Sequence, residues 1–416
     1  MIDLCSLDSE KLLSLDHALK NIINSVKAVS GTEIIPLPDA LGRILALTVT
    51  SPIDLPYERN SAMDGYAFDS TEVNLESSFS LQLAGTSWAG NPFVGVINKG
   101  ECLRVFTGAV VPGQLDTVVM QEQVKVIDNR VHFPASIRSG QFIRPAGEDI
   151  KAGEPLIEAT KCLSAADIGY LAAAGIHHVR VRRPLRIAYL ATGDELVSPG
   201  QPLSSGKIFE SNRSLLRSLL NDAAFTITDL GIIKDDKSEL KETLLDAADN
   251  HDVIISTGGA SVGDADFIKE ILDDCGRVGF WKIAVKPGKP FAFGWLKDCV
   301  FFGLPGNPVS VMVAFDKIVM PALRQMIGAR PTSALRIQAV STENIKKAPG
   351  RQEFMRGILS FSEDNRYEVK SAGNQGSHIL SVLSRANCYI DLPATSRGVT
   401  AGESVWVEPF SIQIER

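Results

Sequence analysis

Residues 252–267 read DVIISTGGASVGDADF, and this stretch decides the fold class of the chain. An apolar run enters a loop of small residues, and a helix is expected to leave it. The same pattern occurs three more times, and the runs are RIAYLATG (186–193), TITDLGII (226–233) and VFFGLPG (300–306). The helices are expected at 211–223, 237–249, 265–274 and 308–327. Strands and helices that alternate in this way predict a doubly wound α/β domain, with a parallel sheet and helices on both faces.

The chain on either side of this unit has other patterns. Helical spacing or capping residues predict helices at 14–28, 38–46 and 164–174, and Ser164 and Gly175 suit the two ends of the last one. Residues 51–68 are rich in turn residues and predict a linker or loop, whereas residues 79–134 are β-like. After residue 331 the helical patterns disappear, and short apolar runs predict a small β-barrel or sandwich.

We therefore predict a multidomain α/β chain with four units. They are an extended helical arm that mediates dimerisation (1–50 with 140–180), a β-rich insertion domain (51–139), the α/β domain (181–328) and a C-terminal β-barrel domain (329–416).

The composition excludes several classes of protein. The 416 residues carry a formal charge of −7, which argues against a general nucleic-acid binder, although local lysines and arginines can still bind an anionic small molecule. The six cysteines are scattered, without a CxxC pair, and this predicts reduced thiols rather than zinc or disulfides. A signal peptide and a long apolar run are both missing, so we expect no membrane span and a cytoplasmic location.

The loop STGGASVGDADF (256–267) is the first candidate site. Glycines allow backbone N–H groups to approach an anion, and the following helix N-terminus adds partial positive charge. Asp264 and Asp266 stand at the helix entrance, where they either cap the helix or share a cation such as Mg²⁺ with a bound phosphate.

The stretch FWKIAVKPGKPFAFG (280–294) is the second candidate. Lys282 and Lys286 are four residues apart, so on one strand they would share a face. Two lysines on a half-buried strand are costly unless an anion compensates them, and the alternative is a solvated edge.

Polar and turn residues also follow the other strands of the predicted sheet. Asp194 and Glu195 follow one strand, Asp235 follows another, and FGLPGNPVS (302–310) makes a rigid turn into a helix. Because parallel strands end at one edge, these residues are expected to meet there, as in many metal and phosphate sites.

The stretch SAMDGYAF (61–68) presents Asp64 in the linker. A tight Asp-Gly turn is the simple structural interpretation of this motif.

In these motifs the chain resembles the MoeA family, the molybdopterin molybdenumtransferases, and it is similar to the E domain of gephyrin. The matching stretches, in chain order, are NSAMDGYAF (60–68), FTGAVVP (106–112), DTVVMQE (116–122), RPAGEDI (144–150), ATGDEL (191–196), STGGASVGDADF (256–267), VKPGKPFAFG (285–294), FGLPGNPVS (302–310) and QGSH (375–378).

The resemblance implies a MogA-like α/β domain and an enzyme that inserts molybdate into adenylylated molybdopterin with release of AMP. It implies Mg²⁺ as cofactor and a homodimer in which SAMDGYA of one subunit approaches the α/β domain of the other. It also implies contact with a MogA-like adenylyltransferase, molybdoenzyme apoproteins or their chaperones. The same fold could instead support molybdopterin adenylylation, or a non-catalytic scaffold as in gephyrin.

The resemblance also assigns residues to roles. Asp64, Glu195, Asp235, Asp266, Lys282 and Lys286 are the expected catalytic residues, and Asp235 and Asp266 are the expected Mg²⁺ ligands. The expected molybdopterin-binding residues are Thr107, Asp149, Gly258, Gly259, Ser261, Gly263, Pro305, Pro308, Arg356 and Ser377. This chain departs from the family pattern at Glu58-Arg59 and at Phe209-Glu210, and neither departure removes a site residue.

Overall fold

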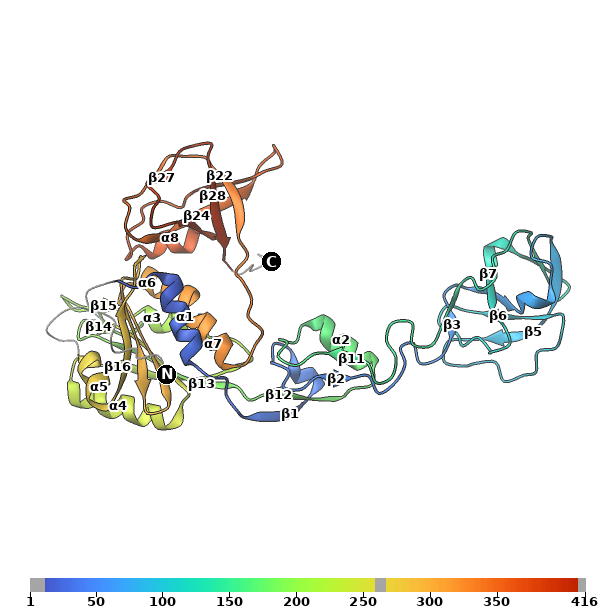
Figure 1. Ribbon diagram of the computed structural model, residues 1–416, viewed down its shortest axis with the longest axis horizontal. Coiled ribbons are helices and arrows are strands. Elements are labelled where there is room, and N and C mark those ends of the chain that lie inside the picture. The colour runs from blue at the N-terminus through green and yellow to red at the C-terminus, as the bar shows by residue number, and fades with distance from the viewer. Residues whose placement is uncertain (1–11, 259–266, 411–416) are drawn as a thin grey trace.

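The computed structural model describes residues 12–258 and 267–410. The chain contains three six-stranded sheets, and an arm with two-stranded ribbons connects one of them to the other two. Figure 1 shows the α/β domain and the C-terminal barrel at one end of an elongated chain, and the insertion domain at the other end.

The α/β sheet has the strand order β16-β13-β17-β21-β20-β18. Its strands are β13 (Leu185–Thr192), β16 (Phe225–Ile233), β17 (Val253–Thr257), β18 (Gly276–Lys282), β20 (Pro290–Leu296) and β21 (Cys299–Leu304). The first four strands in the sheet order are parallel, as predicted, but β20 is antiparallel to both β21 and β18. Only Lys297 and Asp298 separate β20 from β21, and so short a connection can join antiparallel strands only.

Helices cover both faces of this sheet. They are α3 (Asn212–Leu219), α4 (Lys237–Asn250), α5 (Phe267–Cys275), α6 (Pro308–Ala314) and α7 (Met320–Met326), and a π-helical turn (Phe315–Val319) joins the last two. One core contains Ile255 of β17 with residues of α3, α6 and α7, and a second core contains Ile254 with residues of α4 and α5. Neighbouring residues of a strand point to opposite faces, so the doubly wound arrangement is confirmed.

The helix α1 (Leu15–Ser25) lies against the α/β domain and not along the arm where we expected residues 1–50. Its buried Leu15, Ala18 and Ile22 belong to the core that also contains α7. The apolar stripe of α1 is therefore covered within its own chain.

The arm consists mainly of short antiparallel ribbons. β1 (Thr32–Pro36) pairs with β12 (His178–Arg182), and β2 (Val49–Thr50) pairs with β11 (Pro155–Ile157). The helix α2 (Ala165–Ala173) begins at the predicted cap Ser164, which forms a capping box with Asp167. The helix predicted at 38–46 is wrong: a single 3₁₀ turn (Leu37–Ala40) ends before Gly42, whose φ of 76° is incompatible with a helix.

The insertion domain is a six-stranded sheet of order β7-β4-β6-β5-β9-β8. Its strands are β4 (Gly65–Phe68), β5 (Phe79–Ser87), β6 (Glu101–Val105), β7 (Thr117–Met120), β8 (Lys125–Ile127) and β9 (Arg130–Phe133). The ribbon β3 (Asn60–Ser61) and β10 (Ile143–Arg144) leads into this domain.

The C-terminal domain is a closed five-stranded barrel of β24-β25-β22-β28-β26, because β26 also pairs with β24. Its strands are β22 (Ile337–Ser341), β24 (Gln352–Phe361), β25 (Tyr367–Ser371), β26 (Cys388–Leu392) and β28 (Ser404–Pro409), and α8 (Leu380–Arg385) packs beside them. β19 (Val285–Lys286) pairs with β24, and the remaining short strands are β14 (Leu196–Val197), β15 (Ile208–Phe209), β23 (Ile345–Lys346) and β27 (Gly398–Val399). In the described part of the chain, no helix is long and apolar enough to cross a membrane.

The carboxylate of Asp252 ties together the beginnings of β13 and β17. It accepts hydrogen bonds from both terminal nitrogens of Arg183, at 2.7 and 2.9 Å, and from the backbone N–H of Arg186 at 2.9 Å. The side chain of Arg186 completes the cluster at 3.0 Å. Burial alone would raise the pKa of Asp252, but these hydrogen bonds outweigh burial and hold the pKa well below its ordinary value.

We predict that Asp252→Asn lowers the free energy of unfolding by about 2–3 kcal/mol at neutral pH, because charge-assisted hydrogen bonds are lost. A depressed carboxylate pKa stabilises the fold fully above the pKa of the unfolded state, near 4, and this contribution declines as the pH falls from there towards the lower pKa of the folded state. Urea unfolding of both proteins between pH 3 and 7 measures the difference. A gap that stays constant down to pH 3 contradicts the assigned charge.

Candidate functional site

Four parallel strands end side by side at one edge of the α/β sheet. The register pairs Thr192 with Ile233, and Thr257 with Leu304, at the ends of these strands. The loops that carry Asp194, Glu195, Asp235, Gly258 and Pro305 therefore emerge next to one another. This edge is where ligands collect in open α/β sheets.

The loops after β13 and β16 hold two carboxylates against each other. The backbone N–H of Asp194 donates to Asp235 Oδ2 at 3.4 Å, and the N–H of Asp235 donates to Asp194 Oδ1 at 3.3 Å. Burial, together with the nearby charges of Asp194 and Glu195, raises the pKa of Asp235. Lys207 donates to the backbone carbonyl of Asp194 at 2.5 Å, and no ion pair to these three carboxylates occurs within the described residues.

Gly258 has the backbone conformation and the close contact that only glycine tolerates. Its φ is 83°, and an added Cβ would lie 2.4 Å from the carbonyl oxygen of Thr192. Its N–H donates to the carbonyl of Leu304 at 3.2 Å. The chain thus leaves β17 pressed against the end of β13 at the start of the glycine-rich loop.

Four of the predicted site residues lie outside the described residues. They are Gly259, Ser261, Gly263 and Asp266. The adjoining turn is described: Pro305 and Pro308 flank Asn307, which is the N-cap of α6 but makes no side-chain capping bond.

The prediction that Lys282 and Lys286 share a strand face is wrong. Lys282 ends β18 in the α/β sheet, whereas Lys286 lies in β19, which pairs with β24 of the barrel. Pro287 and Gly288 then turn the chain back, so that the N–H of Ile283 reaches the carbonyl of Lys289 at 3.2 Å. Lys286 forms an ion pair of 2.9 Å with the buried Glu353, a partner that the sequence analysis missed.

The barrel presents Arg356 and the QGSH loop. Arg356 is 1% exposed, burial lowers its pKa, and its Nε has no hydrogen-bond partner. Its two terminal nitrogens make only long bonds of 3.4 Å, to the carbonyls of Phe354 and Gly376. A buried guanidinium with such weak partners is poised for an anion.

The QGSH loop touches both Arg356 and the α/β domain. Gln375 accepts from the N–H of Arg356 at 2.8 Å and donates to its carbonyl at 3.1 Å. The carbonyl of Ser377 accepts from the N–H of Val309 at 3.3 Å, at the start of α6. Gln375 was not predicted as a site residue, although QGSH was among the quoted motifs.

Asp64 and Thr107 lie together in the insertion domain. The N–H and the hydroxyl of Thr107 donate to Asp64 Oδ1 at 2.8 and 2.7 Å, and these bonds lower the pKa of Asp64. Asp149 is exposed in the arm. Figure 1 shows the insertion domain far from the sheet edge of the same chain, so one chain does not unite all the predicted site residues.

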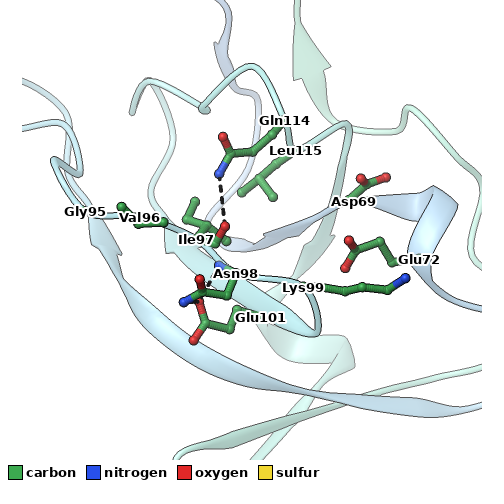
Figure 2. A pocket seen from close by; sticks show the side chains of 10 residues that line it. All are labelled: Asp69, Glu72, Gly95, Val96, Ile97, Asn98, Lys99, Glu101, Gln114 and Leu115. Atoms are coloured by element: carbon green, nitrogen blue, oxygen red, sulfur yellow. Dashed lines mark hydrogen bonds between the residues drawn. The ribbon is translucent and has the colours of Figure 1, made fainter.

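The insertion domain also contains a pocket of about 310 Å³, shown in Figure 2. Its carboxylates are held by the surrounding loops: Glu72 accepts from the N–H of Gly100 at 2.9 Å, and Glu101 accepts from the N–H of Asn98 at 2.6 Å. None of the predicted site residues lines this pocket. We assign it no function.

Comparisons with known proteins cover the whole described architecture. The MoeA N-terminal region (domain I and II) matches residues 13–175, a probable molybdopterin binding domain matches 188–325, and the MoeA C-terminal region (domain IV) matches 338–410. The molybdopterin molybdenumtransferase of Haemophilus influenzae is 41% identical over 402 residues, which are 96% of this chain and 99% of that protein. This chain belongs to the MoeA family.

Two other members extend the comparison. Gephyrin of Dictyostelium discoideum is 31% identical over 95% of this chain, and the match covers 62% of gephyrin. The crystal structure of the molybdopterin biosynthesis MoeA protein from Pyrococcus horikoshii superposes with a TM-score of 0.82 at 30% identity, over 96% of this chain and all of that one. The resemblance and the fold class predicted from the sequence are thereby confirmed for this MoeA-family chain.

We predict that Gly258→Ala disrupts the sheet edge, because its Cβ would collide with the Thr192 carbonyl and its φ is strained for alanine. The loss of stability should be about 1–3 kcal/mol. Gly306→Ala is the matched control at the same sheet edge, because an added Cβ at Gly306 meets no atom within 4 Å. Thermal unfolding of the two variants measures the contrast, and equal melting temperatures would refute the assigned contact.

Proposed function

We propose that this chain is a molybdopterin molybdenumtransferase, which inserts molybdate into adenylylated molybdopterin and releases AMP. Family membership supports the reaction, and the relative at 41% identity bears that name. The observation that carries the proposal is that two kinds of group border one sheet edge: carboxylates stand at the strand ends, and the barrel loop beside the cationic Arg356 contacts the start of α6. A ligand with phosphates and a bound cation needs both kinds of group.

The carboxylate cluster fits Mg²⁺ in its donor chemistry. Asp194, Glu195 and Asp235 carry hard oxygen donors, and burial together with the charges of Asp194 and Glu195 raises the pKa of Asp235. Within the described residues, no group of three or more His, Cys, Asp or Glu side chains is placed to hold a metal ion on its own. Mg²⁺ commonly takes one or two carboxylates and completes its shell with phosphate and water oxygens. We assign Asp235 and Asp266 as these carboxylates, and the bound ion would neutralise charge on the pyrophosphate.

The remaining residues bind and orient the ligand. Lys282, Lys286 and Arg356 balance the charge of phosphate or molybdate oxygens, and the GGASVG backbone offers N–H donors. The reaction breaks the P–O bond that joins AMP to the pterin phosphate, and the attacking oxygen comes from water or from molybdate. AMP leaves, and the two dithiolene thiols replace two oxo ligands of molybdate, which depart as hydroxide with the two thiol protons.

We further infer that the active site is shared between two copies of the chain. Asp64 and Thr107 lie at the opposite end of the chain from Asp235, so a second copy must bring them together. The insertion domain of one subunit would then enter the site of its partner. An adenylyltransferase supplies the substrate, apoproteins or chaperones receive the product, and the cytoplasm is the expected compartment.

The reaction is tested by incubating the protein with adenylylated molybdopterin, Mg²⁺ and molybdate, and measuring AMP. We expect AMP only when both ions are present. Release of pyrophosphate from ATP and molybdopterin, without any molybdate-dependent AMP, would instead indicate adenylylation.

The neighbouring residues Asp235 and Asp236 allow a test that distinguishes metal binding from helix capping. Asp236 accepts from the N–H of Glu239 at 2.8 Å as the N-cap of α4, so Asp236→Asn should keep both fold and activity, because Asn caps as well as Asp. We predict that Asp235→Asn, and likewise Asp266→Asn, lowers AMP release by about 10²-fold or more, because a charged ligand for the cation is lost. Near-normal turnover of Asp235→Asn at saturating Mg²⁺ would refute its metal role.

The shared site predicts complementation between two inactive variants. Asp64→Asn and Asp235→Asn homodimers should both be inactive, whereas a heterodimer has one intact site. After subunit exchange, we expect about a quarter of wild-type turnover, because half of the dimers are mixed and each has one working site. Light scattering follows the dimer in parallel. No recovery in a preparation that contains mixed dimers would show that each site belongs to one chain.

A further inference from the structure

A stacked aromatic pair, of which Trp88 is exposed and Phe106 is partly buried, stands beside Asp64 in the insertion domain. Trp88 and Phe106 stack with ring centroids 4.1 Å apart and an interplanar angle of 9°. Trp88 is 50% exposed, although burial of an indole is normally favourable. An exposed aromatic surface next to a predicted site residue is available for contact with a ligand.

The sheet register explains why these residues are neighbours. β5 and β6 are parallel, and their last registered pair is Ser87 with Val105, so Trp88 and Phe106 follow as the next pair. β4 pairs with the other side of β6, and Gly65 lies opposite Val105, which brings Asp64 level with Phe106. Asp64, Phe106 and Trp88 therefore form a row across the ends of three neighbouring strands, β4, β6 and β5. With strands about 4.8 Å apart, the row spans roughly 10 Å.

The pair is held rigidly before any ligand arrives. The backbone groups of Trp88 and Asn91 exchange two hydrogen bonds, of 3.0 and 3.1 Å, around Gly90. The guanidinium of Arg104 lies over the ring of Phe106, 4.9 Å from its centroid. Phe106 thus supports the indole, and an arriving ring would lose little affinity to ordering of the side chain.

We propose that Trp88, supported by Phe106, is a stacking platform for a planar, fused nitrogen heterocycle of the substrate. This inference rests on the proposed function, because it requires that the Asp64 end of the insertion domain enters the partner's site. Adenylylated molybdopterin carries two such rings, the adenine and the pterin. Stacking accepts either ring, since it depends on a flat π-face and not on a set pattern of hydrogen bonds.

The position of the platform implies a role in binding and not in the chemical step. Trp88 is separated from Asp64 by Phe106, about two strand spacings along the row. That separation is comparable with the reach from a base to its phosphate in a nucleotide. Trp88 would hold one end of the ligand while Asp64 and Thr107 contact its reacting part.

Enzyme kinetics test the proposal with a matched control. Trp88→Leu should raise the KM for adenylylated molybdopterin by about 5- to 100-fold and leave kcat nearly unchanged, whereas Trp88→Phe should recover most of the affinity. Trp406→Leu removes another half-exposed tryptophan, on the barrel, and should change neither value. An unchanged KM in Trp88→Leu overturns the proposal. The proposal is also overturned if light scattering shows that the Trp88→Leu protein has lost its dimer and this loss accounts for the higher KM. Trp88 would then be a subunit contact.

Fluorescence identifies the ring and keeps the test independent of turnover. We expect AMP or neopterin, added separately, to quench tryptophan emission in the wild type and in Trp406→Leu but not in Trp88→Leu, and the ligand that does so names the ring. If the wild type releases no AMP, the proposed function fails, and the platform is then judged by this quenching alone. In that case, the absence of any Trp88-dependent quenching by either ligand overturns it.

Discussion

The common direction of β13, β16, β17 and β21 is the constraint on which the site depends. Parallel strands deliver their last residues to the same edge, so loops that are far apart in sequence emerge together. The backbones are also closely packed at this edge, because Gly258 lies so near the carbonyl of Thr192 that no side chain would fit between them. The acidic loops and Gly258 keep their relative positions as long as this register holds.

Two further contacts fix the barrel over that edge. Tyr389 of the barrel donates to Asp316 of the π-helical turn at 2.8 Å, and Lys317 of the same turn forms an ion pair with Glu408. Both bonds lie in low-dielectric surroundings: burial raises the pKa of Asp316 and, even more, that of Tyr389. A buried polar network is stable only when its members are satisfied, so it favours one orientation of the two domains. Arg356 owes its place near α6 to that orientation.

The sequence predicted the elements whose cause is local. The N-cap at Ser164, the apolar runs of the parallel strands and the acidic residues after those strands all follow from the local sequence, although the capping box that Ser164 forms with Asp167 was not predicted. Pairing between distant segments could not be predicted in this way. Lys282 and Lys286 read as one strand, yet the chain turns at Pro287-Gly288 and gives each lysine to a different sheet. The buried Glu353 that pairs with Lys286 was missed for the same reason, because only the barrel's pairing with β19 brings the two together.

The arm explains why a compact site can be built from an extended chain. The ribbons β1–β12 and β2–β11 provide backbone hydrogen bonds and a small core of their own, which includes Leu45 and Leu171. They keep the insertion domain away from the α/β domain of the same chain, so that the described residues of the two domains do not touch. Asp64 is nevertheless prepared for a ligand, because Thr107 holds Oδ1 with two bonds and keeps the carboxylate ionised. The oriented carboxylate of Asp64 can bind a ligand that a second protein surface brings to the insertion domain. The elongated shape fits the shared site proposed above, in which the insertion domain of one chain serves the α/β domain of a second copy.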